Sequence, residues 1–326
     1  MLDHPYLQSM RWPHRRLIHL SAPLPVGLNQ HAQHVTVQLA LAHGEMRTIK
    51  EIVARNIIER LIEAGTLKSG MTAIDATSGG TGRGYAGILQ PLGIRLKLIV
   101  QGSLPSGKLT QLRVYGEGVE CIPHFGGDES TVGRARREAE ENGYVLLDQY
   151  ANEANPEAHQ LHTAPELWEL TGGDVAAIVA ASGTCGTAIG FSRYFKQRDP
   201  NVQIIGVAVD PNQKVPQIPG MRTLPEIKRD VRLGWEEAID EMRLALRDDA
   251  IRGSRQLAYA EPSWPGLSTG AAYDQAVEYI NENLHWLRGK RVIIISADSI
   301  EPYMDIMMGE QDDADIAKAF ANRPDF

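Results

Sequence analysis

Residues 71–82 read MTAIDATSGGTG, an apolar run that ends in the glycine-rich sequence Thr77-Ser78-Gly79-Gly80-Thr81-Gly82. A near-continuous apolar run of this length is typical of a parallel strand that is covered on both faces. The glycines lie between this strand and a helix expected over 83–92, so their backbone N–H groups are placed to form an anion-binding turn. The alternative is a tight strand–helix turn that needs glycine only for its backbone conformation. The stretch therefore predicts a parallel sheet, and its loop is a candidate ligand site.

The rest of the chain repeats this alternation of apolar runs and helical patterns. We expect further strands over 95–101, 118–123, 144–149, 175–182, 202–209 and 291–297. Further helices are expected over 106–116, 131–142, 186–197, 235–247 and 269–284. Alternation of this kind predicts a doubly wound α/β architecture whose ligands lie at the carboxyl ends of the strands.

Two glycine-rich loops, at Ser78 and at Gly183, each follow an expected strand, which predicts two sheet domains with a cleft between them. The polar, helix-breaking stretch at 150–156 is the expected crossing point. We therefore expect a smaller α/β domain over 43–150 and a larger one formed by 1–42 and 151–326. The proline-rich segment 210–226 is expected to be irregular and to lie near the site.

The composition excludes several classes of protein. The formal net charge of -8 gives no basic footprint, so neither nucleic acid nor an anionic membrane is expected as the main partner. No run approaches the roughly 20 apolar residues of a membrane span, and the N-terminus lacks the features of a secretory signal. Two cysteines, Cys121 and Cys185, do not make a disulfide framework in 326 residues. A soluble cytoplasmic protein is therefore expected.

A lysine stands at the start of another expected helix. Thr48-Ile49-Lys50-Glu51 reads as a capping box, with Thr48 at the N-cap and Glu51 at the third helical position, and Gly65 is the expected stop. Lys50 then lies in the first helical turn, where the helix dipole and burial both lower the pKa of its amine. A neutral amine near an anion-binding loop suits Schiff-base chemistry, and a solvated surface lysine is the alternative.

A second loop, Ser182-Gly183-Thr184-Cys185-Gly186-Thr187, follows the strand over 175–182 and precedes a helix. Its small residues and hydroxyl groups suit a phosphate group. Cys185 has no partner base in the nearby sequence, so we expect a packing role rather than a nucleophile. Ser268 opens a third such segment, with a helix N-cap as the alternative interpretation. Gly102 to Gly107-Lys108 imitates a phosphate-binding P-loop, but Leu109 stands where that motif requires serine or threonine, so we exclude it.

Six segments in this order resemble the fold type II pyridoxal-phosphate enzymes, and most closely the cysteine synthase and cystathionine β-synthase branch. They are residues 44–50, 77–82, 149–156, 183–187, 268–272 and 298–303. The resemblance runs from about Leu24 to Tyr303. It implies pyridoxal 5'-phosphate as the cofactor, held in the cleft between two domains as in the tryptophan synthase β-like fold. No metal is implied.

The resemblance also implies roles for individual residues. Lys50 is the implied Schiff-base lysine and general base. The implied cofactor-binding residues are Lys50, Gly80, Gly183, Thr184, Cys185, Gly186, Thr187 and Ser268, with Ser268 facing the pyridine nitrogen. The implied substrate-binding residues are Thr77, Ser78, Gly79, Thr81 and Gln149. Arg222 is a further candidate, for the phosphate of O-phosphoserine, and a surface arginine on a mobile loop is the alternative.

The implied reaction is β-elimination or β-replacement on a β-substituted L-amino acid through an α-aminoacrylate. O-acetylserine, O-phosphoserine, serine and cysteine are the implied substrates, and a thiol or another nucleophile would complete a cysteine synthase-like replacement. The alternatives are a deaminating lyase (a cysteine desulfhydrase or a serine/threonine dehydratase) and a relative that binds the cofactor without turnover. A homodimer is also implied.

Three residues depart from the family's pattern. Gly80 stands where asparagine is usual, Cys185 replaces a glycine of the phosphate loop, and Glu51 after the lysine is atypical. In the family the asparagine amide contacts the cofactor's ring hydroxyl and the substrate, so its loss is expected to change the reaction preference. We therefore expect a divergent member of the family.

Overall fold

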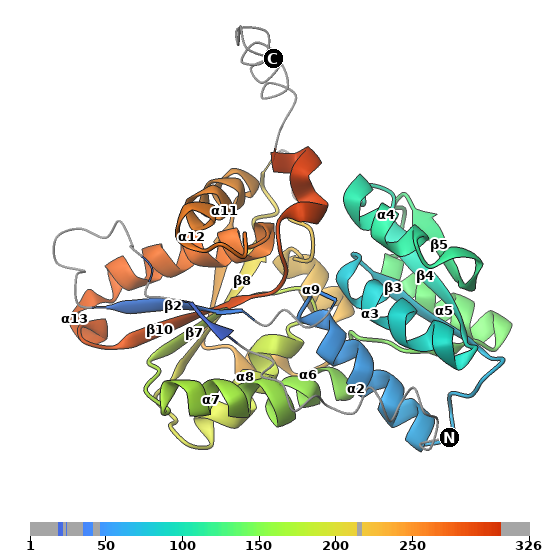
Figure 1. Ribbon diagram of the computed structural model, residues 1–326, viewed down its shortest axis with the longest axis horizontal. Helices are drawn as coiled ribbons and strands as arrows, with labels where there is room; N and C mark the ends of the chain where they lie inside the picture. Colours follow the sequence, from blue (N-terminus) through green and yellow to red (C-terminus); the bar gives the residue numbers. More distant parts are fainter. Residues whose placement is uncertain (1–18, 22–23, 25–34, 42–45, 214–216, 308–326) are drawn as a thin grey trace, which may run out of the picture.

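A computed structural model describes residues 19–21, 24, 35–41, 46–213 and 217–307. The described strands form two sheets, and helices cover them (Figure 1). The expected α/β class with two mainly parallel sheets is confirmed. The predicted domain boundaries stay a prediction.

The smaller sheet has four parallel strands in the order β5-β4-β3-β6. These strands are β3 (Thr72–Thr77), β4 (Arg95–Gln101), β5 (Val119–His124) and β6 (Val145–Leu146). The helices of this region are α2 (Lys50–Glu63), α3 (Gly80–Leu89), α4 (Ser106–Arg113) and α5 (Thr131–Asn142), with short 3-10 turns at Gln90–Leu92 and Gly116–Gly118. Central strands such as β3 are buried on both faces, which explains their near-continuous apolar sequences.

The larger sheet has six strands in the order β1-β2-β10-β7-β8-β9. They are β1 (His19–Leu20), β2 (Thr36–Leu41), β7 (Ala177–Ala181), β8 (Gln203–Val209), β9 (Glu241–Ala245) and β10 (Arg291–Ser296). All pairs are parallel except β1 with β2. Its helices are α6 (Ala154–Ala158), α7 (Ala164–Thr171), α8 (Gly186–Lys196), α9 (Leu224–Asp230), α10 (Trp235–Ala238), α11 (Arg247–Ala260), α12 (Leu267–Glu282) and α13 (Leu284–Leu287). A π-helical turn (His159–Thr163) joins α6 to α7, and a 3-10 turn (Glu301–Tyr303) follows β10.

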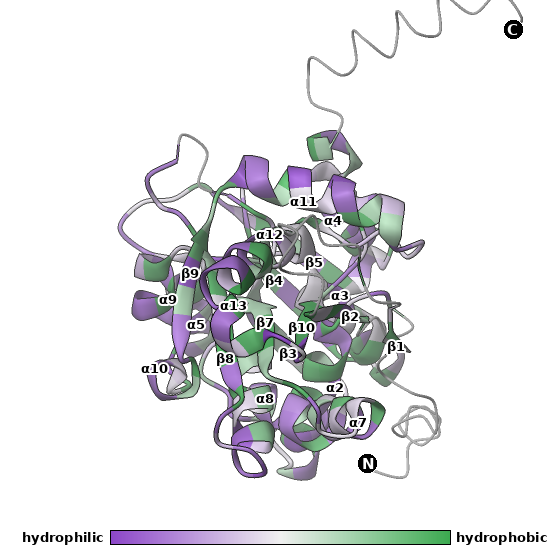
Figure 2. Ribbon diagram, turned by 90° about the vertical axis from the view of Figure 1, so that its left-hand side faces the viewer, coloured by the Kyte–Doolittle hydropathy of each residue, from purple (hydrophilic) through white to green (hydrophobic). Residues whose placement is uncertain are grey.

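Alternate residues of β7 belong to two separate hydrophobic clusters, which shows why helices cover both faces of this sheet. Ile178 packs in a cluster with Phe191 of α8, whereas Val179 packs in a cluster with Ala276 of α12. Figure 1 shows α11 and α12 on one side of the sheet, and α7 and α8 on the other. In Figure 2 hydrophobic residues mark the central strands β7 and β10, as their buried sequences require.

The helix predicted over 235–247 is wrong. The structure has the short helix α10 to Ala238, then the strand β9, and α11 begins only at Arg247. β9 is an edge strand with one neighbour, so its sequence EMRLA has none of the continuous apolar character of a central strand. Pairing with β8 overrides the helical preference of these residues.

No helix among the described residues is long and apolar enough to cross a lipid bilayer.

Candidate functional site

One cavity receives residues from the ends of strands in both sheets. It brings together nine of the residues predicted from the sequence: Lys50, Ser78, Gly80, Thr81, Gln149, Gly183, Thr184, Thr187 and Ser268. Thr77, Gly79, Cys185, Gly186 and Arg222 are not among its lining residues. The cavity therefore joins the two glycine-rich loops, as expected from the carboxyl-end rule.

Lys50 is positioned by contacts with the end of the larger sheet. Helix α2 begins at Lys50, and the N–H of the preceding Ile49 donates to the carbonyl of Ala297 (2.8 Å), immediately after β10. The predicted capping box does not form, because the Glu51 carboxylate accepts from the N–H of Met46 (2.8 Å) rather than from Thr48. The backbones of Thr48 and Asp298 instead form an isolated antiparallel β-bridge, which links the start of α2 to the segment after β10.

Burial lowers the pKa of the Lys50 amine, and the negative charge of Asp298 opposes this effect. The same environment acts on His159, whose pKa falls to about 3 because of burial first and the Lys50 charge second. His159 is therefore neutral at pH 7, and its two ring nitrogens lie 3.0 Å from Thr163 Oγ1 and 3.3 Å from Thr187 Oγ1. This neutral imidazole orients the Thr187 hydroxyl at the cavity wall.

Hydrogen bonds within the loop after β3 hold its conformation. Thr77 Oγ1 accepts from the N–H groups of Gly79 and Gly82, both at 3.0 Å, so Thr77 holds the turn instead of lining the cavity. Gly79 has φ 113°, which favours glycine. Thr81 Oγ1 donates to Gln149 Oε1 (2.7 Å), and Gln149 Nε2 donates to the carbonyl of Ala76 (2.7 Å). These bonds fix the two side chains that were predicted to contact substrate.

Gly80 is the closest neighbour of the lysine stem in this loop. A Cβ at residue 80 would lie 3.0 Å from Thr48 Oγ1 and 3.3 Å from Lys50 Cγ. Any side chain here would press on the residue that carries the amine.

The loop after β7 is closely packed against its surroundings. A Cβ at Gly183 would lie 2.5 Å from the carbonyl oxygen of Gly220, and one at Gly186 would lie 2.0 Å from Asn155 Oδ1. Asn155 Nδ2 donates to Thr184 Oγ1 (2.9 Å), which fixes that hydroxyl. The loop ends at the N-terminus of α8, where backbone N–H groups have no intrahelical acceptor. Hydroxyls and N–H groups of this kind are the usual partners of a phosphate.

Cys185 supplies its backbone to this loop, and its side chain packs in the hydrophobic core. Its φ of 62° is in the left-handed region, which glycine adopts more easily. Burial raises the pKa of its thiol to about 12, so no thiolate is available at neutral pH. The predicted packing role fits this arrangement.

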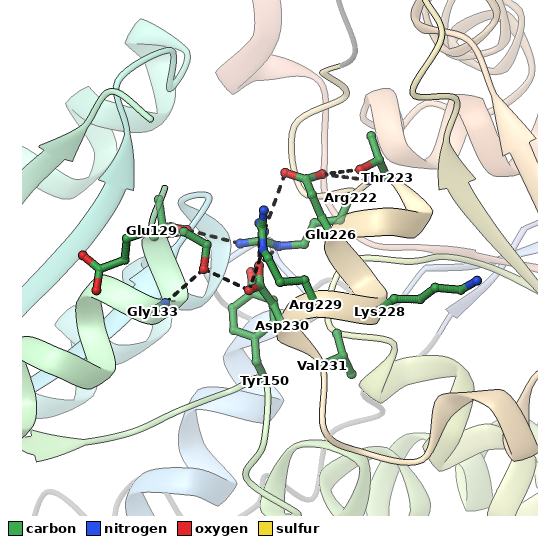
Figure 3. Close-up of polar contacts among 12 residues, drawn as sticks. Glu129, Gly133, Tyr150, Arg222, Thr223, Glu226, Lys228, Arg229, Asp230 and Val231 are labelled. Carbon is green, nitrogen blue, oxygen red and sulfur yellow. Dashed lines mark hydrogen bonds and ion pairs between the residues drawn. The ribbon is translucent and has the colours of Figure 1, made fainter. Parts of the chain in front are cut away.

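The candidate role of Arg222 in binding substrate phosphate does not fit the structure. Its guanidinium is buried and donates to the Tyr150 hydroxyl (3.0 Å), to Asp230 Oδ2 (3.0 Å) and to Thr131 Oγ1 (3.3 Å) (Figure 3). Asp230 also accepts from the hydroxyl of Ser130 (2.9 Å). Arg222 therefore joins α5 of the smaller sheet to α9 of the larger one, and each of its three guanidinium nitrogens already donates to a protein group.

Lys108, which the P-loop comparison had excluded, lines the cavity. Its amine is buried and lies 2.9 Å from Asp298 Oδ2 and 4.7 Å from the centre of the Tyr303 ring. The Tyr303 hydroxyl donates to the same carboxylate. The position of α4, directly after the carboxyl end of β4, was the available signal for Lys108.

Comparison with known proteins gives a consistent result. Residues 23–298 match the family described as pyridoxal-phosphate dependent enzyme. Cysteine synthase B of Pseudomonas aeruginosa is 33% identical over 215 residues, which cover 63% of this chain and 71% of that protein. Cysteine synthase B of Escherichia coli is 31% identical over 238 residues, which cover 72% of this chain and 77% of that protein.

Solved structures agree in fold. A hydrogen sulfide-producing enzyme from Fusobacterium nucleatum has a TM-score of 0.78 at 24% identity, covering 88% of this chain and 97% of that one. O-ureido-L-serine synthase has a TM-score of 0.75 at 23% identity, covering 93% of this chain and 96% of that one.

Proposed function

Because the chain belongs to the pyridoxal-phosphate dependent enzymes, as a distant relative of cysteine synthases, we propose that it catalyses β-replacement or β-elimination on a β-substituted L-amino acid. The substrates proposed are O-acetylserine, O-phosphoserine, serine and cysteine. The observation that carries the proposal is the position of Lys50. Its amine, with a lowered pKa, faces the cavity in which the two glycine-rich loops meet.

The residues of the cavity fit the cofactor. Lys50 would bind its aldehyde, the Thr184 and Thr187 hydroxyls with the start of α8 would hold its phosphate, and Ser268 would face its ring nitrogen. Glycine at 183 and 186 supports this, because it allows the close backbone approaches by which this phosphate loop is packed. When bound, pyridoxal phosphate supplies a sink for the electron pair left on the substrate's Cα.

The chain's own groups handle the proton and the carboxylate. A neutral Lys50 amine accepts a proton at Nζ, and the burial that lowers its pKa favours this neutral form. The hydroxyl of Ser78 has no hydrogen-bond partner among the described residues, so it is available to the α-carboxylate of the substrate. Ser268 offers a neutral hydroxyl where a carboxylate would favour a protonated ring, which limits charge storage and favours loss of a β-substituent.

The first test measures the absorption spectrum of the purified protein. Protein loaded with pyridoxal phosphate should show an absorption band that Lys50→Ala removes, and a wild type that takes up no cofactor would refute the proposal. The loaded protein is then given each candidate amino acid with and without a thiol. A thioether or cysteine product indicates β-replacement, whereas pyruvate formed without the thiol indicates β-elimination.

A further inference from the structure

A second cavity, here called the vestibule, adjoins the catalytic cavity. It has a volume of about 240 Å³ and lies between the starts of α3 and α4 and the segment after β10. Thr48, Gly80 and Lys108 line both cavities. The vestibule therefore shares part of its wall with the cavity that Lys50 lines.

Gly80 stands at the junction of the two cavities. A Cβ at this position would already lie within 3.0 Å of Thr48 Oγ1, so a larger side chain would fill the junction or displace its walls. Glycine at position 80 keeps the wall shared by the two cavities free of a side chain.

The vestibule carries an excess of positive charge. Three cations line it, Arg47, Arg83 and Lys108. The Arg47 guanidinium pairs with Glu301 (2.9 Å), and the Lys108 amine pairs with Asp298 (2.9 Å). In the part of the chain that the structure describes, Arg83 has neither an ion-pair partner nor a side-chain hydrogen bond. The whole chain has a net charge of -8, so the charge of the vestibule is opposite in sign to that of the protein.

Arg83 is half-buried, so its charge is partly removed from water without compensation. A guanidinium presents a planar set of donors that matches a carboxylate or a phosphate. Gln111, which also lines the vestibule and has no side-chain hydrogen bond among the described residues, adds a neutral amide donor. Among the described residues, no carboxylate pairs with Arg83, and the vestibule's Glu301 pairs with Arg47.

We propose that the vestibule binds an anionic group, carboxylate or phosphate, carried by one of the two reactants, with Arg83 as its charged partner. The proposal rests on the proposed function, since it assigns a second binding site to that reaction. Two sources of the anion are compatible with the geometry: the incoming nucleophile, or the β-substituent of the amino acid. In either case the enzyme selects reactants by charge at a point beyond the α-carboxylate.

The first experiment measures binding without turnover. The protein loaded with pyridoxal phosphate is titrated with succinate at constant ionic strength, and calorimetry gives the Kd for the wild type, Arg83→Gln and Arg113→Gln. Arg113 lies exposed on α4 and does not line the vestibule, so its variant is a control with the same change of charge. We expect Arg83→Gln to weaken succinate binding roughly tenfold and Arg113→Gln to leave it unchanged. Equal binding by all three proteins, or none by the wild type, would overturn the proposal.

The second experiment identifies the source of the anion. One arm compares mercaptoacetate with 2-mercaptoethanol as nucleophiles, and the other compares O-phosphoserine with O-acetylserine as substrates. We expect Arg83→Gln to lower the ratio of kcat/KM values, anionic over neutral, roughly tenfold in one arm. A lower ratio in the comparison of the two thiols assigns the anion to the nucleophile. A lower ratio in the comparison of the two serine derivatives assigns it to the β-substituent. Unchanged ratios in both arms would refute the vestibule site.

Failure of the proposed function would look different. The wild type would then turn over none of the four reactant pairs, while the succinate titration would still show whether Arg83 binds an anion. Circular dichroism and thermal melting of Arg83→Gln, compared with Arg113→Gln, verify that both variants are folded.

Discussion

The Lys108 amine and the Asp298 carboxylate form a buried ion pair of 2.9 Å between two chain segments that are 190 residues apart. Lys108 belongs to α4, which follows a strand of the smaller sheet, and Asp298 follows β10 of the larger one. The pair therefore joins the two sheet regions at the rim of the catalytic cavity.

Removal of one partner should leave a buried charge without compensation. We expect Lys108→Ala to lower the apparent free energy of unfolding by about 3 kcal/mol, because an isolated buried carboxylate is costly. Urea titration followed by circular dichroism measures the change. Lys97→Ala is the control, because Lys97 pairs with the exposed Glu120 and its loss should cost less than about 1 kcal/mol. Equal effects of the two variants would contradict this account.

Lys50 should lower the stability of the cofactor-free protein. Burial lowers its pKa below the ordinary 10.5, so at pH 7 folding carries the cost of holding this amine out of water. We expect Lys50→Met to stabilise the cofactor-free protein by about 1 kcal/mol at pH 7. Between the lowered pKa and 10.5 the unfolded chain binds more protons than the folded one, so the wild type gains stability as the pH rises. The advantage of Lys50→Met should therefore shrink toward pH 10, and an advantage that is constant with pH would count against the argument.

Asp75 gives a pH dependence of the opposite sign. Burial first, and the nearby Asp148 second, raise its pKa from 3.8 to about 7, while the Tyr85 hydroxyl donates to its Oδ2 (2.9 Å). Between these two values the folded protein binds the proton and the unfolded chain does not, so this contribution to stability is lost as the pH rises to about 7. We expect Asp75→Asn to flatten the fall in stability between about pH 5 and pH 6, which lie roughly one unit inside the two pKa limits. Unfolding titrations at several pH values test this, and identical pH profiles for the two proteins would exclude the role of Asp75.

At position 185 we expect glycine to give a more stable protein than alanine, which is the reverse of the usual order of stability. Its φ of 62° is costly for any residue with a Cβ, by about 1 kcal/mol or more. We therefore expect Cys185→Gly to be more stable than Cys185→Ala by about 1 kcal/mol, as measured by thermal and urea unfolding. At Cys121, in the strand β5, the order should be the ordinary one, with alanine more stable than glycine. A less stable Cys185→Gly would show that strain at this position is small.

Local patterns explain which parts of the site could be predicted. The loops after β3 and β7 carry their own constraints, such as the positive φ of Gly79 and the close approach of Gly183 to Gly220, so their sequences reveal them. The strands β3, β4, β7, β8 and β10 were found because burial on both faces gives them continuous apolar sequences. The strand β2 also has two neighbours, but it was not predicted, because Thr36 and Gln38 interrupt its apolar run. The edge strand β9 was missed because its stability comes from β8, which no local pattern reports.

Residues that depend on distant partners could not be assigned in the same way. Lys108 follows the carboxyl end of an expected strand, which was the one available signal that it faces the cavity. For Arg222 the sequence gives no indication of its network with Tyr150 and Asp230. Arg83 directly follows the glycine-rich loop, but only the fold shows that it lines a cavity and that no described residue forms an ion pair with it.

The hydrogen bond from the N–H of Ile49 to the carbonyl of Ala297 also bears on the order of assembly. The segment that places the reactive amine is complete only when β10 has joined the larger sheet, although α2 belongs to the first third of the chain. During synthesis, residue 49 leaves the ribosome long before residue 297 does. If the protein binds the proposed cofactor, we therefore expect binding to be a late step of folding. The appearance of the cofactor's absorption during refolding should then report the completed molecule rather than a folded N-terminal part.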